Sequence, residues 1–255
     1  MNRVGAMAQV NQIYGEDVVN SQETKWMDKP SGDPSGLAYL KPLNSLLVKQ
    51  VLPLMPENGD PTKFAIFNDK GEQVYYAFEE SHLCQRLWCT QSRGFDLHIV
   101  DSANKEVIYL RRSFKYCAGC CWCACSDACR QEITVESPPG TVIGFVTQEC
   151  SCWYIQYILR DEADQPVLKI VGPDCICDGS CSCCSENNFT LYGTDGVSEI
   201  GVIHKVYHGY KAEARSNADT FMIQLPIDLN TRMKAVALGA LFLIDFSHFY
   251  QAYVK

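Results

Sequence analysis

Cysteine is the residue type whose number and spacing offer the clearest chemistry in this sequence. The chain has 255 residues and 15 cysteines, and 13 of the cysteines lie between Cys117 and Cys184. Two cysteines with two residues between them are typical ligands of zinc and of iron–sulfur clusters. The pairs Cys117 with Cys120 and Cys181 with Cys184 have this spacing. One interpretation is therefore a four-thiolate zinc or iron–sulfur site built from both pairs.

The compartment decides what else the thiols can do. Residues 1–26 contain no apolar stretch or cleavage site typical of a secretory signal, and Asn2 stands where myristoylation needs glycine. An odd number of cysteines cannot pair fully within one chain. We therefore expect the thiols to be metal-bound, acylated, or reduced with no role. Four cysteines near the ends of predicted strands are expected to be packing residues: Cys84, Cys89, Cys150 and Cys152.

Charge and motifs exclude several classes of function. The chain has 22 Lys and Arg against 30 Asp and Glu, a formal net charge of −8. This balance removes a general attraction to nucleic acid or anionic lipid, so no nucleic-acid partner is expected. The sequence contains no phosphate-binding glycine loop, no HExxH and no G-x-S-x-G. It therefore gives no support for an enzyme of the nucleotide-hydrolysing or serine-nucleophile classes.

The elements that must position the cysteines are mainly strands. Residues 1–36 end in a cluster of Pro, Gly and Ser and predict a flexible arm, and residues 37–255 predict one folded domain. Short runs of β-branched and aromatic residues then alternate with turn formers. They predict five hairpins and a last strand: 64–67 with 73–78, 95–100 with 106–110, 131–136 with 142–147, 153–159 with 167–171, 188–192 with 200–206, and 221–225. So many strands must close or stack to protect their edges, which predicts one β-barrel or sandwich.

A helix is predicted at the end of the chain, over about residues 230–250. Residues 235–244 are apolar on every face and rich in Ala and Leu, with Asp228 or Asn230 placed to cap them. A membrane span needs about 20 mainly apolar residues, whereas this run meets Asp245 after ten. A helix that fills a β-barrel is therefore favoured over a span.

Several segments resemble one known family. They are residues 137–140 (SPPG) with 143–146 (IGFV), 167–173 (VLKIVGP), 233–246 (MKAVALGALFLIDF) and the cysteine block at 117–129. These segments are similar to the phospholipid scramblases, over about residues 36–250. That family is related to the tubby-like domains. The resemblance implies a closed twelve-stranded antiparallel β-barrel around a central hydrophobic C-terminal helix.

The resemblance also assigns a role to the cysteine block. In scramblases the corresponding stretch is palmitoylated, which carries over to Cys120, Cys121, Cys123 and Cys125. Each buried methylene of an acyl chain contributes about 0.8 kcal/mol, and stable anchoring takes two or more chains. Four such thiols could hold an acidic chain at a membrane. The family usually has proline where this chain has Ala124, a change that leaves the thiols in place.

A calcium segment is the second carry-over. Residues 217–228 resemble the segment proposed to bind calcium in scramblases, whose acidic positions map to Asn217, Asp219 and Asp228. Here the first carboxylate is an amide, so we expect only a weak site, with a dissociation constant of about 10⁻⁴ to 10⁻³ M. The other interpretation is structural. Residues 221, 223 and 225 would form the inward face of a strand, and Asp228 would cap the helix.

The resemblance implies a function without covalent chemistry. A lipid-anchored chain on the cytoplasmic face of a membrane, with the plasma membrane expected, would promote calcium-dependent, ATP-independent movement of phospholipids between leaflets. Calcium at Asp219 and Asp228 would free the C-terminal helix to insert, alone or in a homo-oligomer. Two other functions stay open: a palmitoylated module that binds lipids or signalling partners without transport, and a zinc or iron–sulfur protein. SH3 and WW partners are not expected, because the arm contains only Pro30 and Pro34.

Overall fold

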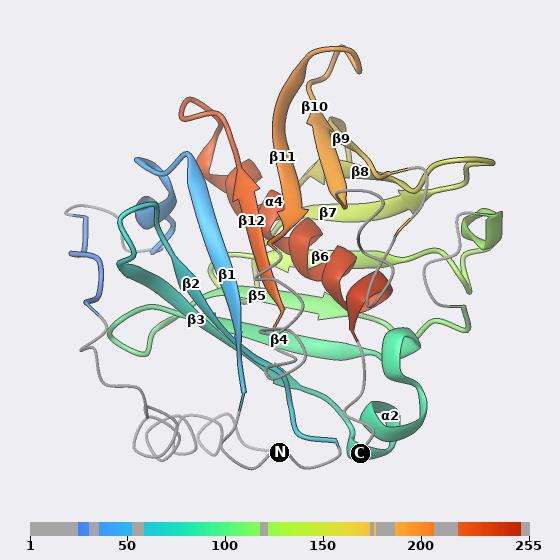
Figure 1. The fold of residues 1–255 in the computed structure, drawn as a ribbon, viewed down its shortest axis with the longest axis horizontal. Coiled ribbons are helices and arrows are strands. Elements are labelled where there is room, and N and C mark those ends of the chain that lie inside the picture. The colour runs from blue at the N-terminus through green and yellow to red at the C-terminus, as the bar shows by residue number, and fades with distance from the viewer. Residues whose placement is uncertain are drawn as a thin grey trace.

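Twelve antiparallel strands form one closed barrel in the computed structural model, which describes residues 25–30, 36–52, 59–117, 122–173, 176, 187–206 and 219–250. Each strand pairs with its neighbours in sequence, and β1 also pairs with β12 (Figure 1). The strands are β1 (Ser45–Val51), β2 (Lys63–Phe67), β3 (Gln73–Glu80), β4 (Phe95–Val100), β5 (Glu106–Arg112), β6 (Glu132–Glu136), β7 (Val142–Glu149), β8 (Gln156–Asp161), β9 (Pro166–Val171), β10 (Asn188–Tyr192), β11 (Glu199–Lys205) and β12 (Thr220–Gln224). The closed twelve-stranded barrel implied by the resemblance is confirmed.

All five predicted hairpins and the last strand are present, but the strand pattern missed β1. Its sequence, SLLVKQV, alternates buried Leu46 and Val48 with partly exposed neighbours. The pattern is short, and the two adjacent leucines at its second and third positions obscure the alternation. β1 closes the barrel, because Leu47 lies opposite Phe67 of β2 on one side and Met222 of β12 on the other.

The C-terminal helix fills the barrel, as predicted. Helix α4 (Thr231–Ile244) continues as a short π-helix, η5 (Asp245–Phe249), and every residue from Met233 to Ile244 is buried. Asn230 is the N-cap, since its side chain accepts a hydrogen bond from the backbone N–H of Arg232. Within the described residues, no helix combines the length and apolarity needed to cross a membrane.

Two glycines let the helix approach the barrel wall closely. A Cβ at Gly239 of α4 would lie 2.8 Å from a methyl group of Val135 on β6, and one at Gly144 of β7 would lie 2.6 Å from a methyl group of Val236. Contacts this short do not occur between real side chains, so larger residues would push the helix off β6 and β7. The helix and the wall are thus fitted to each other.

A buried ammonium fixes the first turn of the helix. Lys234 is 1% exposed, and its Nζ donates to the carbonyl oxygens of Leu40, Lys41, Leu43 and Ile227 at 2.7–3.2 Å. Burial lowers the pKa of this lysine. Three of the four carbonyls lie in or after the 3-10 helix η1 (Leu37–Leu40), so the cation joins the segment before β1 to the start of α4.

Part of the predicted flexible arm is attached to the barrel. Trp26 forms a parallel bridge with Gln73 at the start of β3, and the backbone N–H of Met27 donates to the carbonyl oxygen of Gln73 at 2.9 Å. Lys25 pairs with Glu72. Residues 1–24 and 31–35 of the predicted arm lie outside the described residues.

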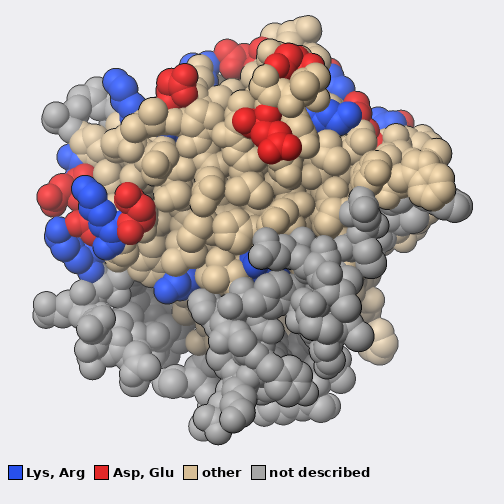
Figure 2. Space-filling view, turned by 45° about the horizontal axis from the view of Figure 1, so that its top comes forward, with Lys and Arg blue, Asp and Glu red and all other residues tan. Residues whose placement is uncertain are grey.

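On the face drawn in Figure 2, most charged residues of the described part lie toward the left and upper margins, and one acidic group lies further in. Lysines and arginines lie close to acidic residues along the left margin of this view. Among the described residues on this face, charged side chains of the two signs lie near one another and form no broad patch of a single sign.

Candidate functional site

Alternate links of an up-and-down barrel lie at the same end, and this rule gathers the cysteines. The links at one end connect β1 with β2, β3 with β4, β5 with β6, β7 with β8, β9 with β10, and β11 with β12. We call this end of the barrel the cysteine end. All eight cysteines in the described part of the chain lie in three of these links: Cys84, Cys89, Cys117, Cys123, Cys125, Cys129, Cys150 and Cys152. The C-terminal end of the α4–η5 helix lies at the same end, because the chain enters α4 at the opposite one (Figure 1).

The predicted acylation sites fall in the link between β5 and β6. Cys123 and Cys125 lie in the 3-10 helix η3 (Trp122–Cys125), and Cys123 is partly exposed. Cys125 forms a disulfide with Cys150. A thioester cannot form on a sulfur that is held in a disulfide, so Cys125 is open to acylation only after reduction. Cys120 and Cys121 lie outside the described residues.

The expectations for the other cysteines need two corrections. Cys117 pairs with Cys129, so four cysteines at this end are in disulfides rather than reduced. Cys84, Cys150 and Cys152 are exposed rather than packed, and Cys89 is partly exposed. All four lie in links outside the strands of the barrel wall.

The four-thiolate site stays a prediction. Of its proposed ligands, Cys117 is in a disulfide, and Cys120, Cys181 and Cys184 lie outside the described residues. Among the residues that the structure describes, no three His, Cys, Asp or Glu side chains are grouped to hold a metal ion.

A buried glutamine fixes the link between β5 and β6, which we call the cysteine link, to the barrel. Gln131 is fully buried, and its Nε2 donates to the carbonyl oxygens of Cys117 at 2.7 Å and Cys129 at 2.9 Å. Its Oε1 accepts a hydrogen bond from Arg112. Lys115, which is also buried, donates to Glu132 at 2.7 Å. The two ends of the link are thereby held beside the strands that they join.

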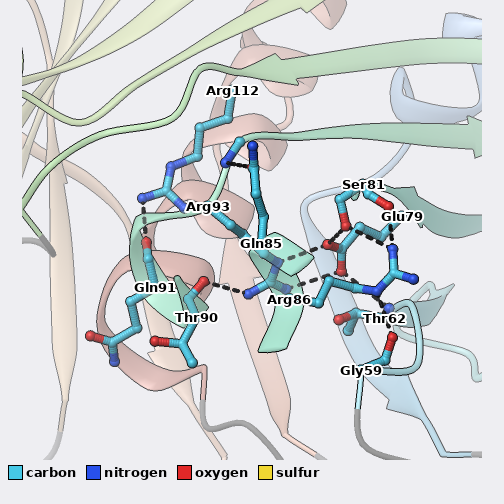
Figure 3. A network of polar contacts seen from close by, with 11 residues as sticks. Gly59, Thr62, Glu79, Ser81, Gln85, Arg86, Thr90, Gln91, Arg93 and Arg112 are labelled. Carbon is cyan, nitrogen blue, oxygen red and sulfur yellow. Dashed lines mark hydrogen bonds and ion pairs between the residues drawn. The ribbon is translucent and has the colours of Figure 1, made fainter. Parts of the chain in front are cut away.

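A buried ion pair lies under the neighbouring link, which contains α2 (Leu83–Trp88) and η2 (Thr90–Ser92). The side chains of Arg93 and Glu79 are both fully buried, and two hydrogen bonds of 2.8 and 3.0 Å join them (Figure 3). Burial alone would raise the pKa of Glu79, but the hydrogen bonds and charge of Arg93 outweigh it and lower that pKa. Glu79 also accepts the backbone N–H of Thr62 at 3.1 Å.

The same arginine holds the end of the C-terminal helix. Its guanidinium carbon lies 3.8 Å from the ring centroid of Tyr250 and 4.7 Å from that of Phe246. Gln91 of η2 donates to the carbonyl oxygen of Tyr250 at 3.4 Å. Cation–π contacts strengthen when water is excluded, as it is around this buried arginine. The last residues of the helix are thus clamped to the cysteine end.

A second buried arginine connects the contact between Arg93 and Tyr250, which we call the clamp, to the cysteine link. Arg112 donates to the carbonyl oxygen of Gln91 at 2.7 Å (Figure 3). It also donates to Oε1 of Gln131. Burial, together with the charge of Arg93, lowers the pKa of Arg112 to about 10, so it stays charged at neutral pH. Burial and Arg112 lower the pKa of His248 to about 3.

The residues of the predicted calcium segment are not brought together. Asp219 precedes β12 and pairs with Lys205 at 2.7 Å, whereas Asp228 follows β12 in the turn before α4. The strand between them separates the carboxylates by about 20 Å, at a rise of about 3.3 Å per residue. One calcium ion holds its oxygen ligands at 2.3–2.6 Å, so Asp219 and Asp228 do not fit a single site. Asn217 lies outside the described residues.

The structural interpretation of this segment agrees with the packing. Phe221, Ile223 and Leu225 are buried in the barrel core, as an inward-facing strand requires. Of the two predicted caps, Asp228 and Asn230, the structure has Asn230 at the N-cap position.

Sequence reasoning missed α2 and the Arg93–Glu79 pair. The sequence of α2, LCQRLW, places Leu83 and Leu87 one helical turn apart, and this spacing could have predicted the helix. The ion pair has no comparable signal, because Glu79 stands at the end of a strand where charged residues usually face water. Its partner Arg93 comes from an irregular link.

Fold and site together define a closed β-barrel that encloses its own C-terminal helix and collects cysteines at one end. The sequence model of the Scramblase family matches residues 24–251. The chain is 42% identical to phospholipid scramblase 1 of Mus musculus over 232 residues, which cover 89% of this chain and 68% of that protein. It is 35% identical to phospholipid scramblase 2 of Bos taurus, covering 96% and 83%, and 33% identical to phospholipid scramblase family member 5 of Homo sapiens, covering 85% and 78%. The chain belongs to the phospholipid scramblase family.

Proposed function

We propose that this chain promotes movement of phospholipids between the two leaflets of a membrane, in response to calcium and without ATP. The observation that carries the proposal is the extent of the family match, which runs from residue 24 to residue 251 and so includes the whole described barrel and its helix. The relatives at 33–42% identity bear the name phospholipid scramblase. The movement makes and breaks no covalent bond, so no catalytic residue is assigned.

Acylated thiols at the cysteine end would hold the chain at the cytoplasmic face of a membrane, with the plasma membrane as the proposed site. Cys123 is the described candidate, with Cys120 and Cys121 close to it in sequence. Two chains suffice for stable anchoring, so the proposal does not need Cys125, which is held in a disulfide.

Lipid movement is proposed to occur with the C-terminal helix in place. Lys234 fixes its first turn through four carbonyl oxygens, and Arg93 holds Tyr250 at its other end. Withdrawing the helix would expose twelve consecutive buried residues and break both contacts. Calcium is kept in the proposal as an effector, without a site at Asp219 and Asp228 together.

Reconstitution in lipid vesicles tests the proposal. The vesicles contain a phospholipid with a fluorescent headgroup, and a quencher that does not cross the membrane is added outside. Labelled lipid that moves from the inner to the outer leaflet loses its fluorescence. The protein should therefore increase the rate at which the fluorescence of inner-leaflet lipid is lost, and chelation of calcium should reduce this increase. A rate equal to that of protein-free vesicles, with protein bound, would refute the proposal. Asp219→Ala and Asp228→Ala, measured separately with and without calcium, show whether either carboxylate mediates the response.

The helix contacts also favour a second candidate function. A barrel whose core helix is held at both ends can serve as a membrane-anchored module that binds lipid headgroups or signalling partners without transport. The same vesicles separate the two functions. Binding without accelerated loss of signal supports the module, and accelerated loss supports lipid movement.

A further inference from the structure

Exposed apolar side chains are concentrated at one end of the molecule. Among the described residues, nine large apolar side chains are exposed, and seven of them lie at the cysteine end: Leu83, Leu87, Trp88, Phe114, Tyr116, Trp153 and Tyr154. The other two, Val197 and Ile227, lie in turns at the opposite end. Five of the seven are aromatic, and Trp88, Trp153 and Tyr116 are 85%, 81% and 78% exposed.

These seven side chains come from three links that are neighbours around the rim. The links follow β3, β5 and β7, and the strands β3 to β8 are adjacent in the barrel order. The backbone N–H of Lys115 donates to the carbonyl oxygen of Ser92 at 3.0 Å, which joins the first link to the second. The disulfide between Cys125 and Cys150 joins the second to the third. We call the seven side chains in these links the aromatic rim.

Basic side chains in the three links are engaged with the protein. Arg86 donates to the carbonyl oxygens of Gly59 and Ser81, and Lys115 pairs with Glu132. Arg130 pairs with Asp127 at 3.1 Å. The aromatic rim is therefore not accompanied by a cluster of unpaired cations that would attract an acidic partner.

The residue types fit the interface of a lipid bilayer. Tryptophan and tyrosine concentrate where headgroups meet hydrocarbon, because their rings are apolar and their N–H or O–H groups remain hydrated. Exposed apolar surface of this kind marks an interaction site in a soluble protein. The cysteine link lies at the same end, so acyl chains on it would bring this end to a bilayer.

We propose that the aromatic rim docks the barrel end-on onto a phospholipid bilayer. Trp88, Tyr116 and Trp153 enter the headgroup region. The C-terminal end of the α4–η5 helix lies at the same end of the barrel (Figure 1) and therefore faces the membrane. The inference rests on the proposed function in taking a membrane as the partner. It goes further in naming the docking residues, the orientation, and a binding mode that depends on apolar insertion rather than on charge.

The test uses the full-length chain without acyl groups and vesicles of phosphatidylcholine, a lipid with no net charge. Binding is measured by centrifugation over a range of lipid concentrations. The triple variant Trp88→Ser, Tyr116→Ser, Trp153→Ser should lower the partition coefficient by at least about tenfold. A rise in salt from about 0.05 to about 0.5 M should change wild-type binding by less than about twofold, since insertion is not screened.

The matched control is Val197→Ser with Ile227→Ser, which removes two exposed apolar side chains from the opposite end. It should bind as the wild type does, and circular dichroism should show that both variants are folded. Equal binding of the triple variant and the wild type would overturn the inference, as would absence of wild-type binding. A dimer that the triple variant abolishes, in a chain that ignores vesicles, would assign the rim to a second copy instead.

The outcomes separate this inference from the proposed function. Vesicle binding that needs the aromatic rim, without accelerated lipid movement, supports the docking surface and refutes transport. Accelerated lipid movement, together with vesicle binding that is unchanged in the triple variant, supports transport and refutes the docking surface.

Discussion

The guanidinium of Arg93 lies 3.8 Å from the ring centroid of Tyr250, and the two residues join the wall of the barrel to the end of the helix inside it. Arg93 is also bound by both carboxylate oxygens of Glu79. One buried cation thus links a strand, a surface link and the C-terminal helix, so the helix end and the cysteine end behave as one unit.

Removing this cation should destabilise the fold strongly. Arg93→Ala leaves the Glu79 carboxylate buried without its partner, and we expect a loss of about 3–5 kcal/mol in the free energy of unfolding. Urea denaturation measures it. The control is Arg111→Ala, because Arg111 pairs with Asp96 at the surface with 58% of its side chain exposed; its loss should stay below about 1 kcal/mol. Equal losses for the two variants would show that the buried pair contributes no more to the free energy of unfolding than the exposed pair does.

His248 should make the fold sensitive to acid. Its pKa is about 3 in the folded chain and 6.5 in the unfolded chain. Between these two pH values the unfolded chain binds a proton at His248 and the folded chain does not. The stability is fully present above pH 6.5 and declines as the pH falls toward about 3, by up to about 1.4 kcal/mol per pH unit. The Tyr157 hydroxyl lies 2.7 Å from Nε2 of His248, and His248→Gln keeps a polar group that can bond to it. In this variant the stability should change less between about pH 5 and 7 than in the wild type. An unchanged slope in the variant would contradict the low pKa.

Lys234 should be essential to the position of the helix. Lys234→Met removes the donor shared by four backbone carbonyl oxygens, and each buried group left without a partner costs about 1–3 kcal/mol. Lys234→Gln, which keeps two donors, should recover part of the loss measured by thermal denaturation. Arg232→Ala serves as the control with little expected change, because Arg232 lies two residues before Lys234 and pairs with Glu162 at the surface. A stable methionine variant would mean that water replaces the ammonium.

The disulfide between Cys125 and Cys150 should control access to Cys125. In protein purified without reductant, alkylation followed by peptide mass spectrometry should find these two cysteines linked and Cys84 modified. Cys150→Ser should make Cys125 reactive, because its partner sulfur is gone. Full alkylation of Cys125 in the wild type would instead restore the sequence-based expectation of reduced thiols, and Cys125 would rejoin the acylation candidates.

Hairpins and the core helix could be predicted from the sequence because their signals are local. Alternation and turn formers mark residues 95–100 and 106–110, and continuous apolarity marks residues 235–244. The clamp could not be predicted in this way. Glu79 and Arg93 face each other only after β3 and β4 pair, and Tyr250 is far away in the sequence. The exposure of Cys84 could not be predicted for the same reason. It depends on the path of the link between β3 and β4, which the sequence near the end of β3 does not indicate.

The calcium segment shows the converse case. Asp219 and Asp228 are close in sequence, and a motif treats them as neighbours. The strand between them is extended, so it carries them to opposite ends of the barrel. Spacing that suits a loop or a helix loses its meaning on a strand.

The most direct test of the account is the rate of lipid movement in vesicles that contain one of three proteins. They are the wild type, the triple variant Trp88→Ser, Tyr116→Ser, Trp153→Ser, and the control Val197→Ser, Ile227→Ser. The account predicts faster movement with the wild type and the control than without protein, and a rate for the triple variant reduced in proportion to its lost binding. Wild-type protein that is bound to the vesicles but leaves the rate at the protein-free value would contradict it.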